Sequence, residues 1–205
     1  MSKFVTLSLL WILPLWLLAE APTGYPYYQK KLYELKQMKQ TDLLFLGDSL
    51  TDYHDWGHFG KHFNAGIAGD TTDGLLYRME YILDKKPATV VLMIGINDLL
   101  QGVSLEQLKQ NYLKILDSLK KIKQLIILST LPVIDDTQTR EINDRVVALN
   151  IFLKIEAKKR GAEYVDLYSH FIDSKKGLMK EYTIDGVHLN DNGYKLWEDI
   201  LSLRI

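Results

Sequence analysis

The chain contains no cysteine, and this absence excludes several kinds of chemistry at once. Disulfide bridges, thiolate metal ligands, a cysteine nucleophile and an acylated-cysteine lipid anchor are all ruled out. A chain of 205 residues can build a sufficient core without disulfides, unlike a small secreted domain. Export of this chain is therefore compatible with its lack of cysteine.

A surplus of positive charge is also lacking. The 25 basic and 26 acidic residues nearly cancel, and no block of lysine and arginine stands apart on a predicted face. Because nucleic-acid-binding proteins present such a basic surface, we expect no nucleic acid partner. The composition, 47% hydrophobic and 25% charged, is typical of one globular domain.

The first 21 residues differ from the rest of the chain. Lys3 precedes an uncharged apolar run from Phe4 to Leu18, which the triplet Ala19-Glu20-Ala21 follows. A basic start, an apolar run and an A-x-A triplet are typical of a secretory signal peptide. A helix over the apolar run would be about 22 Å long, shorter than the roughly 30 Å hydrocarbon core of a bilayer.

We therefore predict a signal peptide over residues 1–21, cut after Ala19 or Ala21, and a single mature domain over residues 22–205. The predicted location is exported, either periplasmic or secreted. A retained anchor is the alternative, and in that case the membrane would be contacted through the signal segment alone. The sequence leaves the oligomeric state open.

Five short segments are predicted to form strands. Three are continuous apolar runs, typical of strands that are buried on both faces of a parallel sheet: Leu43–Gly47, Thr89–Gly95 and Leu125–Thr130. Two shorter runs complete the set: His62–Ala65 and Glu163–Tyr168.

Helical periodicity separates these runs, over Tyr28–Met38, Leu75–Leu83, Leu105–Leu119, Ile142–Leu153 and Tyr194–Leu201. Ser104 and Gln107 form an S-x-x-Q capping signal, and Gly161 is placed to end the fourth helix. Alternation of strand and helix predicts a three-layer α/β/α fold, in which helices cover both faces of a doubly wound five-stranded parallel sheet.

Polar residues and glycines follow three of the predicted strands and also precede the last predicted helix. They lie in Gly47–Leu50, in the stretch that contains Gly66 and Gly69, in Gly95–Asp98 and in Asp185–His188. Ligands of doubly wound sheets bind outside the carboxyl ends of the strands, so these loops are the candidate site. Each residue alone has an ordinary interpretation as a turn, a helix cap or a solvated loop residue.

Together these residues supply the parts that ester hydrolysis requires. Ser49 is the candidate nucleophile, and His188 can accept its proton and return it to the leaving alcohol. Asp185 can hold the imidazole in the correct tautomer. The backbone N–H groups of Ser49 and Gly69 and the side-chain amide of Asn97 are candidate donors to the oxyanion of the tetrahedral intermediate.

The order of these blocks resembles that of the SGNH, or GDSL, hydrolases. The matching blocks are GDSL at Gly47–Leu50, N-x-G-x-x-G-D at Asn64–Asp70, G-x-N-D at Gly95–Asp98 and D-x-x-H at Asp185–His188. Ser49, Gly69, Asn97 and His188 match the four residues that name the family, and Asp185 matches its usual aspartate. The stretch FNAGIAGDTTDGLLYRM is most similar to the subgroup of the platelet-activating-factor acetylhydrolase catalytic subunits.

The resemblance implies a flavodoxin-like sheet and a serine esterase that acts through an acyl-enzyme with no metal and no cofactor. The expected substrates are small-molecule or glycan esters of short acyl groups, such as O-acetyl groups. A lysophospholipase or thioesterase that acts on longer acyl chains is the alternative. The apparent signal peptide departs from the intracellular acetylhydrolases and puts their substrate in doubt.

Two other interpretations stay open. A ligand-binding module could use the loop after the first strand, although Asp48 and Asp52 would repel a phosphate and no G-x-G-x-x-G or Walker pattern follows. A non-catalytic descendant could bind glycans or lipids.

His54, His58 and His62, spaced by four, could form a metal-binding helix face, but Gly57 and Gly60 favour a solvated loop.

Overall fold

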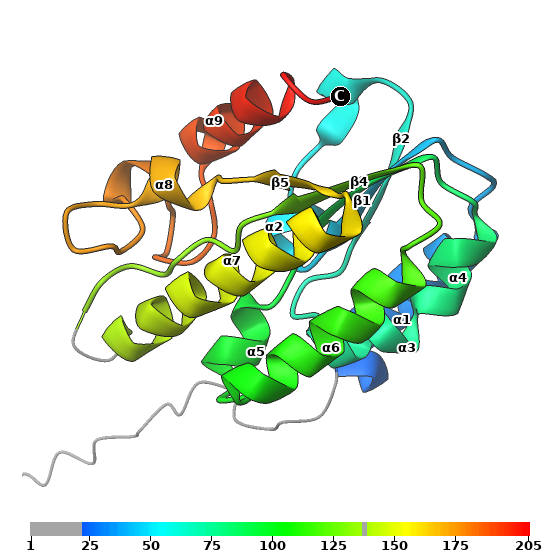
Figure 1. Ribbon diagram of the computed structural model, residues 1–205. Helices are drawn as coiled ribbons and strands as arrows, with labels where there is room; N and C mark the ends of the chain where they lie inside the picture. The colour runs from blue at the N-terminus through cyan, green and yellow to red at the C-terminus, as the bar shows by residue number, and fades with distance from the viewer. Residues whose placement is uncertain (1–21, 137–138) are drawn as a thin grey trace, which may run out of the picture.

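The computed structural model describes residues 22–136 and 139–205, so the predicted signal peptide lies outside the described residues. Figure 1 shows a central sheet with helices on both sides. The elements, in chain order, are η1 Pro22–Gly24, α1 Pro26–Gln37, β1 Leu43–Gly47, α2 Ser49–Asp52, η2 Trp56–Phe59, β2 His62–Gly66, α3 Thr72–Tyr77, α4 Met79–Asp84, β3 Thr89–Met93, α5 Ile96–Leu100, α6 Leu105–Ser118, β4 Gln124–Leu128, α7 Arg140–Arg160, β5 Glu163–Val165, α8 Tyr168–Phe171, η3 Lys180–Tyr182 and α9 Asp191–Leu201.

The sheet confirms the predicted fold class. Its five strands are all parallel and run in the order β2-β1-β3-β4-β5. The chain leaves β1 toward one edge and then returns past it toward the other, so right-handed crossovers place helices on opposite faces. Figure 1 shows α9 on one side of the sheet and α6 and α7 on the other. The direction changes at β1 and β3, where such sheets bind ligands.

The strands are buried on both faces, as continuous apolar runs predict. Leu44 and Leu46 are fully buried on one face of β1, and Phe45 is buried on the other. Phe45 stacks on Trp56, with 4.4 Å between ring centroids, and Trp56 meets Trp197 of α9 at 5.0 Å. This aromatic cluster attaches α9 to the sheet, and the Tyr194 hydroxyl of α9 donates to the Leu50 carbonyl of α2 at 3.1 Å.

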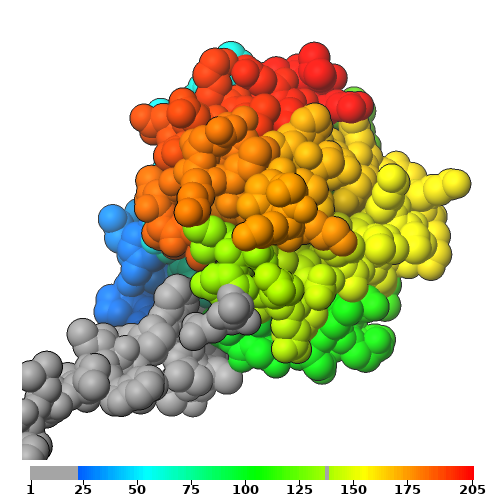
Figure 2. Space-filling model, turned by 90° about the vertical axis from the view of Figure 1, so that its left-hand side faces the viewer, coloured from blue at the N-terminus to red at the C-terminus, as the bar shows by residue number. Residues whose placement is uncertain are grey.

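The C-terminal part of the chain forms one side of the molecule. Figure 2 shows the segment that follows β5, drawn orange to red, over the upper half of that side and next to α7. α7 is 21 residues long and ends at Gly161, whose φ of 66° is left-handed, as predicted. Of the helices within residues 22–136 and 139–205, none combines the length and the hydropathy that crossing a membrane requires.

One predicted helix is wrong. Leu75–Leu83 is not continuous, because α3 ends at Tyr77 and α4 begins at Met79. Arg78 lies between them with φ −102° and ψ 4°, outside the helical region. Its guanidinium is buried and donates hydrogen bonds to carbonyls at the ends of β1 and β2. This burial interrupts the helix at a position where the apolar periodicity predicted a continuous one.

Candidate active site

Ser49 stands at the carboxyl end of β1 as the first residue of α2. The strand ends at Gly47, and only Asp48 separates it from the helix. The Asp48 carboxylate accepts a hydrogen bond from the Leu50 N–H at 3.0 Å and so caps the helix. A side chain at Gly47 would come within 2.2 Å of the Met93 carbonyl, so glycine is needed for this close approach. Ser49 thus lies at the carboxyl edge of the sheet, and only 5% of its surface is exposed.

The structure brings Ser49, His188 and Asp185 into one hydrogen-bonded chain. The Ser49 Oγ lies 3.0 Å from His188 Nε2, although the two residues are 139 positions apart. His188 Nδ1 lies 2.7 Å from Asp185 Oδ2. Asp185 Oδ1 accepts backbone hydrogen bonds from Val187 and His188, so the loop that carries the carboxylate also orients it.

These hydrogen bonds set the charge of Asp185. Burial raises its pKa, but the hydrogen bonds from the His188 ring and from the N–H groups of His188 and Val187 together outweigh burial. The net pKa of Asp185 lies below its ordinary value, so the carboxylate is ionised at neutral pH. An ionised carboxylate at Nδ1 leaves Nε2 free to accept a proton from Ser49.

The candidate oxyanion donors lie at the same carboxyl edge of the sheet as Ser49. The backbone N–H groups of Ser49 and Gly69 donate to no acceptor within residues 22–136 and 139–205. Gly69 has a φ of 78°, in the left-handed region that favours glycine. Asn97 Nδ2 donates one hydrogen to the Asp70 carbonyl at 2.9 Å, so its second hydrogen is available to a ligand. Gly69 follows β2 and Asn97 follows β3, the two neighbours of β1.

The model of the GDSL-like lipase/acylhydrolase family matches residues 45–196 of this chain. The chain belongs to the GDSL-like lipase/acylhydrolase family. The resemblance of the four sequence blocks to the GDSL hydrolases is thereby confirmed.

Two curated proteins with different names are similar in sequence to this GDSL hydrolase. N-acylneuraminate cytidylyltransferase of Escherichia coli is 31% identical over 178 residues, which are 79% of this chain and 40% of that protein. Esterase TesA of Pseudomonas aeruginosa is 27% identical over 135 residues, 65% of this chain and 64% of that protein. The chain thus spans less than two thirds of the length of either curated relative.

A solved structure shares both the fold and the subgroup resemblance. It is a Streptococcus pneumoniae protein whose assignment as a platelet activating factor is itself provisional. The two chains superpose with a TM-score of 0.75 at 25% identity, over 86% of this chain and 91% of the other. The GDSL hydrolase therefore has the flavodoxin-like sheet that the resemblance implied.

Arg78 is a residue of the site region that sequence reasoning missed. It is fully buried, and its Nε donates to Asp70 Oδ2 at 2.9 Å. Its other nitrogens donate to the Ala65 carbonyl at 2.6 Å and the Gly47 carbonyl at 3.0 Å. Arg78 therefore ties the end of β1 to the end of β2, directly behind the loops that carry Ser49 and Gly69. The sequence signal that could have identified it is an arginine within the otherwise apolar helical stretch Leu75–Leu83, because a buried arginine requires polar partners.

Asp98 supports the third loop of the GDSL hydrolase. It is almost fully buried and accepts hydrogen bonds from the N–H and the hydroxyl of Thr72, the first residue of α3. Burial raises the pKa of Asp98 to about 6, against the opposing effect of the Thr72 hydrogen bonds. The residue thus braces the loop of Asn97.

The three spaced histidines do not form a helix face. η2 is a short 3-10 turn, and His54 lies outside it, stacked on Tyr194 with 4.3 Å between ring centroids. His54 also contacts Glu198 at 3.0 Å, so it packs against α9 and is not in a solvated loop. Within the described ranges, no group of three histidine or acidic side chains could hold a metal ion.

Asp48→Asn is expected to raise the free energy of unfolding by about 1–3 kcal/mol at pH 8 and by little at pH 4. Burial raises the pKa of Asp48 to about 7 from its ordinary 3.8, and the Leu50 N–H only partly opposes this. The folded protein therefore binds the Asp48 proton more tightly than the unfolded chain does. The contribution of this proton to the free energy of unfolding is fully present below pH 3.8 and is lost as the pH rises through about 7. Asparagine stays neutral throughout.

Urea unfolding of both proteins from pH 4 to pH 8 measures this difference. Asp84→Asn is the matched control, because the side chain of Asp84 is 77% exposed and should give the same small difference at each pH. A stability difference for Asp48→Asn that does not change with pH would show that Asp48 is not the titrating group.

Proposed function

We propose that this protein is a serine esterase that hydrolyses carboxylic esters through an acyl-enzyme. The observation that carries the proposal is the continuous hydrogen-bonded chain from Ser49 through His188 to Asp185. The backbone N–H groups of Ser49 and Gly69, which donate to no acceptor among the described residues, accompany it at the same edge of the sheet.

In the acylation step, Ser49 Oγ attacks the carbonyl carbon of the ester while His188 Nε2 accepts the hydroxyl proton. Asp185 stabilises the imidazolium that forms. The carbonyl oxygen becomes an oxyanion and accepts hydrogen bonds from the Ser49 N–H, the Gly69 N–H and Asn97 Nδ2. In enzymes of this kind, each such donor lowers the barrier by about 2.7–4 kcal/mol.

Collapse of the intermediate breaks the bond to the leaving oxygen, which takes the proton from His188 and departs as the alcohol. A water molecule then attacks the acyl-enzyme, with His188 again as the base, and the acid product leaves with Ser49 restored. The position of Ser49 at the start of α2 adds the positive end of a helix to the oxyanion environment.

Labelling with a fluorophosphonate probe tests this proposal. Folded protein should be phosphonylated at Ser49, as located by peptide mass mapping, and should lose ester turnover in the same proportion. Heat-unfolded protein is the control, because without the aligned imidazole the serine is an ordinary alcohol. A folded protein that binds glycans or lipids but is neither labelled at Ser49 nor active on esters would instead be a non-catalytic binding module.

The preferred acyl group is short in this proposal, as in O-acetyl esters. Two connections at the active edge support it, because only residue 48 separates β1 from α2 and only residues 94–95 separate β3 from α5. These two short connections supply no segment that could cover a long acyl chain. Export through residues 1–21 stays part of the proposal and makes O-acetylated glycans natural substrates.

A series of nitrophenyl esters from acetate to decanoate distinguishes short-chain from long-chain activity. The proposal expects kcat/KM to fall by about tenfold or more between butyrate and decanoate, because extra methylenes find no apolar enclosure. A steady rise of kcat/KM with chain length would establish the lysophospholipase or thioesterase alternative instead.

A further inference from the structure

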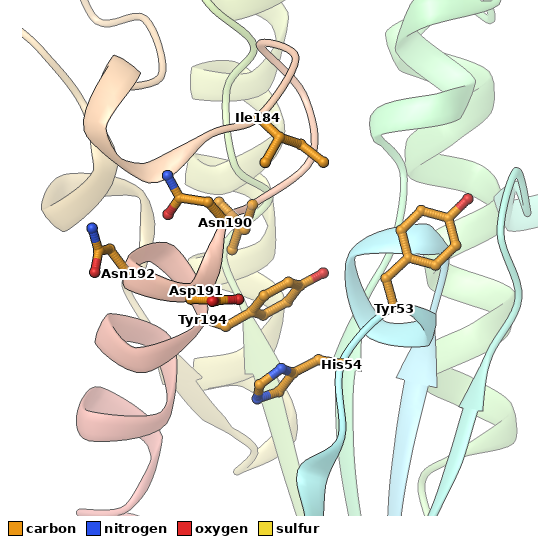
Figure 3. A pocket seen from close by; sticks show the side chains of 8 residues that line it. Tyr53, His54, Ile184, Asn190, Asp191, Asn192 and Tyr194 are labelled. Atoms are coloured by element: carbon orange, nitrogen blue, oxygen red, sulfur yellow. The ribbon is translucent and has the colours of Figure 1, made fainter.

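A cavity of about 600 Å³ opens beside the triad, between the end of α2 and the loop that leads into α9. Figure 3 shows Tyr53 and Ile184 on opposite sides of the opening, with Tyr194 and His54 at its base. Tyr53 is 57% exposed and Ile184 is 71% exposed, unusual values for large apolar side chains that face one another. Neither residue takes part in the mechanism above.

Both sides of the cavity contact the proposed base. The ring of Tyr53 lies 5.3 Å from the imidazole of His188, measured between centroids. The backbone N–H of Ile184 donates to the His188 carbonyl at 3.0 Å. Because His188 must pass its proton to the leaving oxygen, the alcohol part of the ester has to lie next to His188. The cavity is an open depression that adjoins this position.

The lining combines aromatic faces with polar groups that have no internal partner. Within the part of the chain that the structure describes, the side chains of Asp191 and Asn192 make no hydrogen bond to another residue, and both are exposed. Asn190, in contrast, has internal partners at both side-chain atoms, because its Oδ1 accepts from the Gly193 N–H and its Nδ2 donates to the Glu181 carbonyl. Apolar faces with a few free donors and acceptors are typical of small-molecule sites.

The charge of the lining disfavours an anionic alcohol. No lysine or arginine lines the cavity, and Asp191 contributes a carboxylate. The positive end of α9 is already met by the Asn190 cap and by Asp191 in the first turn. Asp185 adds a second carboxylate close by, 49% exposed. A phosphate on the leaving group would therefore be repelled, whereas hydroxyl groups could pair with Asp191 and Asn192.

We propose that this cavity is the leaving-group subsite and that it takes an uncharged, polyhydroxylated alcohol, such as one sugar unit of an acylated glycan. The inference rests on the proposed esterase function of the adjoining triad. Tyr53 supplies the face against which the sugar ring packs, and Asp191 accepts hydrogen bonds from its hydroxyl groups.

The test compares two acetyl esters that differ only in the alcohol: ethyl acetate, too small to fill the cavity, and a mono-O-acetylated methyl glucoside. The measured quantity is the ratio of kcat/KM for the sugar ester to that for ethyl acetate. Tyr53→Ala should lower this ratio by about 10- to 100-fold and Asp191→Ala by about tenfold, mainly through KM for the sugar ester. Tyr77→Ala, which removes a tyrosine that is 56% exposed on α3, is the control and should leave the ratio unchanged.

The outcomes separate this inference from the esterase proposal. If the protein hydrolyses neither ester and Ser49 is not labelled, the esterase proposal itself fails. If ethyl acetate is hydrolysed but the ratio is unchanged in Tyr53→Ala and Asp191→Ala, the leaving-group subsite is wrong. A wild-type preference for the 6-phosphate of the acetylated glucoside over the neutral sugar ester would also overturn it.

Discussion

Ser49→Ala is expected to lower kcat for an acetyl ester by about 10⁴- to 10⁶-fold, because no other hydroxyl within residues 22–136 and 139–205 is hydrogen-bonded to the imidazole ring of His188. The fold should be unaffected, since the Ser49 Oγ bonds only to His188 within residues 22–136 and 139–205. Some turnover above the rate in water should persist, because the backbone N–H groups that await the oxyanion are not removed.

Asp185→Asn should have a much smaller effect, a loss of about 10²- to 10³-fold in kcat. The amide still occupies the position beside His188 Nδ1, but it cannot stabilise the imidazolium. The side chain of Asp185 is 49% exposed, so in the variant water can partly stabilise the imidazolium, unlike at a fully buried aspartate, whose substitution costs about 10⁴-fold. Asp199→Asn, at a carboxylate of α9 that is 61% exposed, is the control. Equal and complete losses in Ser49→Ala and Asp185→Asn would contradict the orienting role.

Arg78→Met is expected to lower the free energy of unfolding by about 3–5 kcal/mol, measured by urea titration. Methionine fills much of the volume but leaves the buried carboxylate of Asp70 unpaired. It also removes the hydrogen bonds that Arg78 donates to the Ala65 and Gly47 carbonyls. Because those carbonyls end β2 and β1, the loops of Ser49 and Gly69 should also become less ordered.

Two further variants identify the cause of this loss. Arg204→Met removes an exposed pair with Glu163 and should change stability by less than about 1 kcal/mol. The double variant Asp70→Leu with Arg78→Met removes both buried charges and should recover part of the stability. A stability within 1 kcal/mol of wild type for Arg78→Met, on the scale of an exposed pair, would show that the buried pair does not hold the loops.

Much of the fold could be predicted because its signals are local. An apolar run such as Leu43–Gly47 predicts a strand that is buried on both faces. Ser104 predicts a helix start, and its Oγ accepts from the Gln107 N–H at 3.1 Å, as the capping pattern requires. Where a side chain takes a distant partner, local signals fail. Arg78 interrupts a helix because its three partners come from other segments.

The candidate site divides in the same way. The sequence by itself determined which residue types stand at the strand ends and in which order, because the strands and turns that carry Ser49, Gly69 and Asn97 are short-range features. Only the tertiary structure decided that His188 contacts Ser49 and that Tyr53 faces Ile184 across a cavity. It also decided that the Asp48 carboxyl is buried away from water, which raises its pKa. These depend on distances between segments far apart in the chain, which packing of the whole core sets.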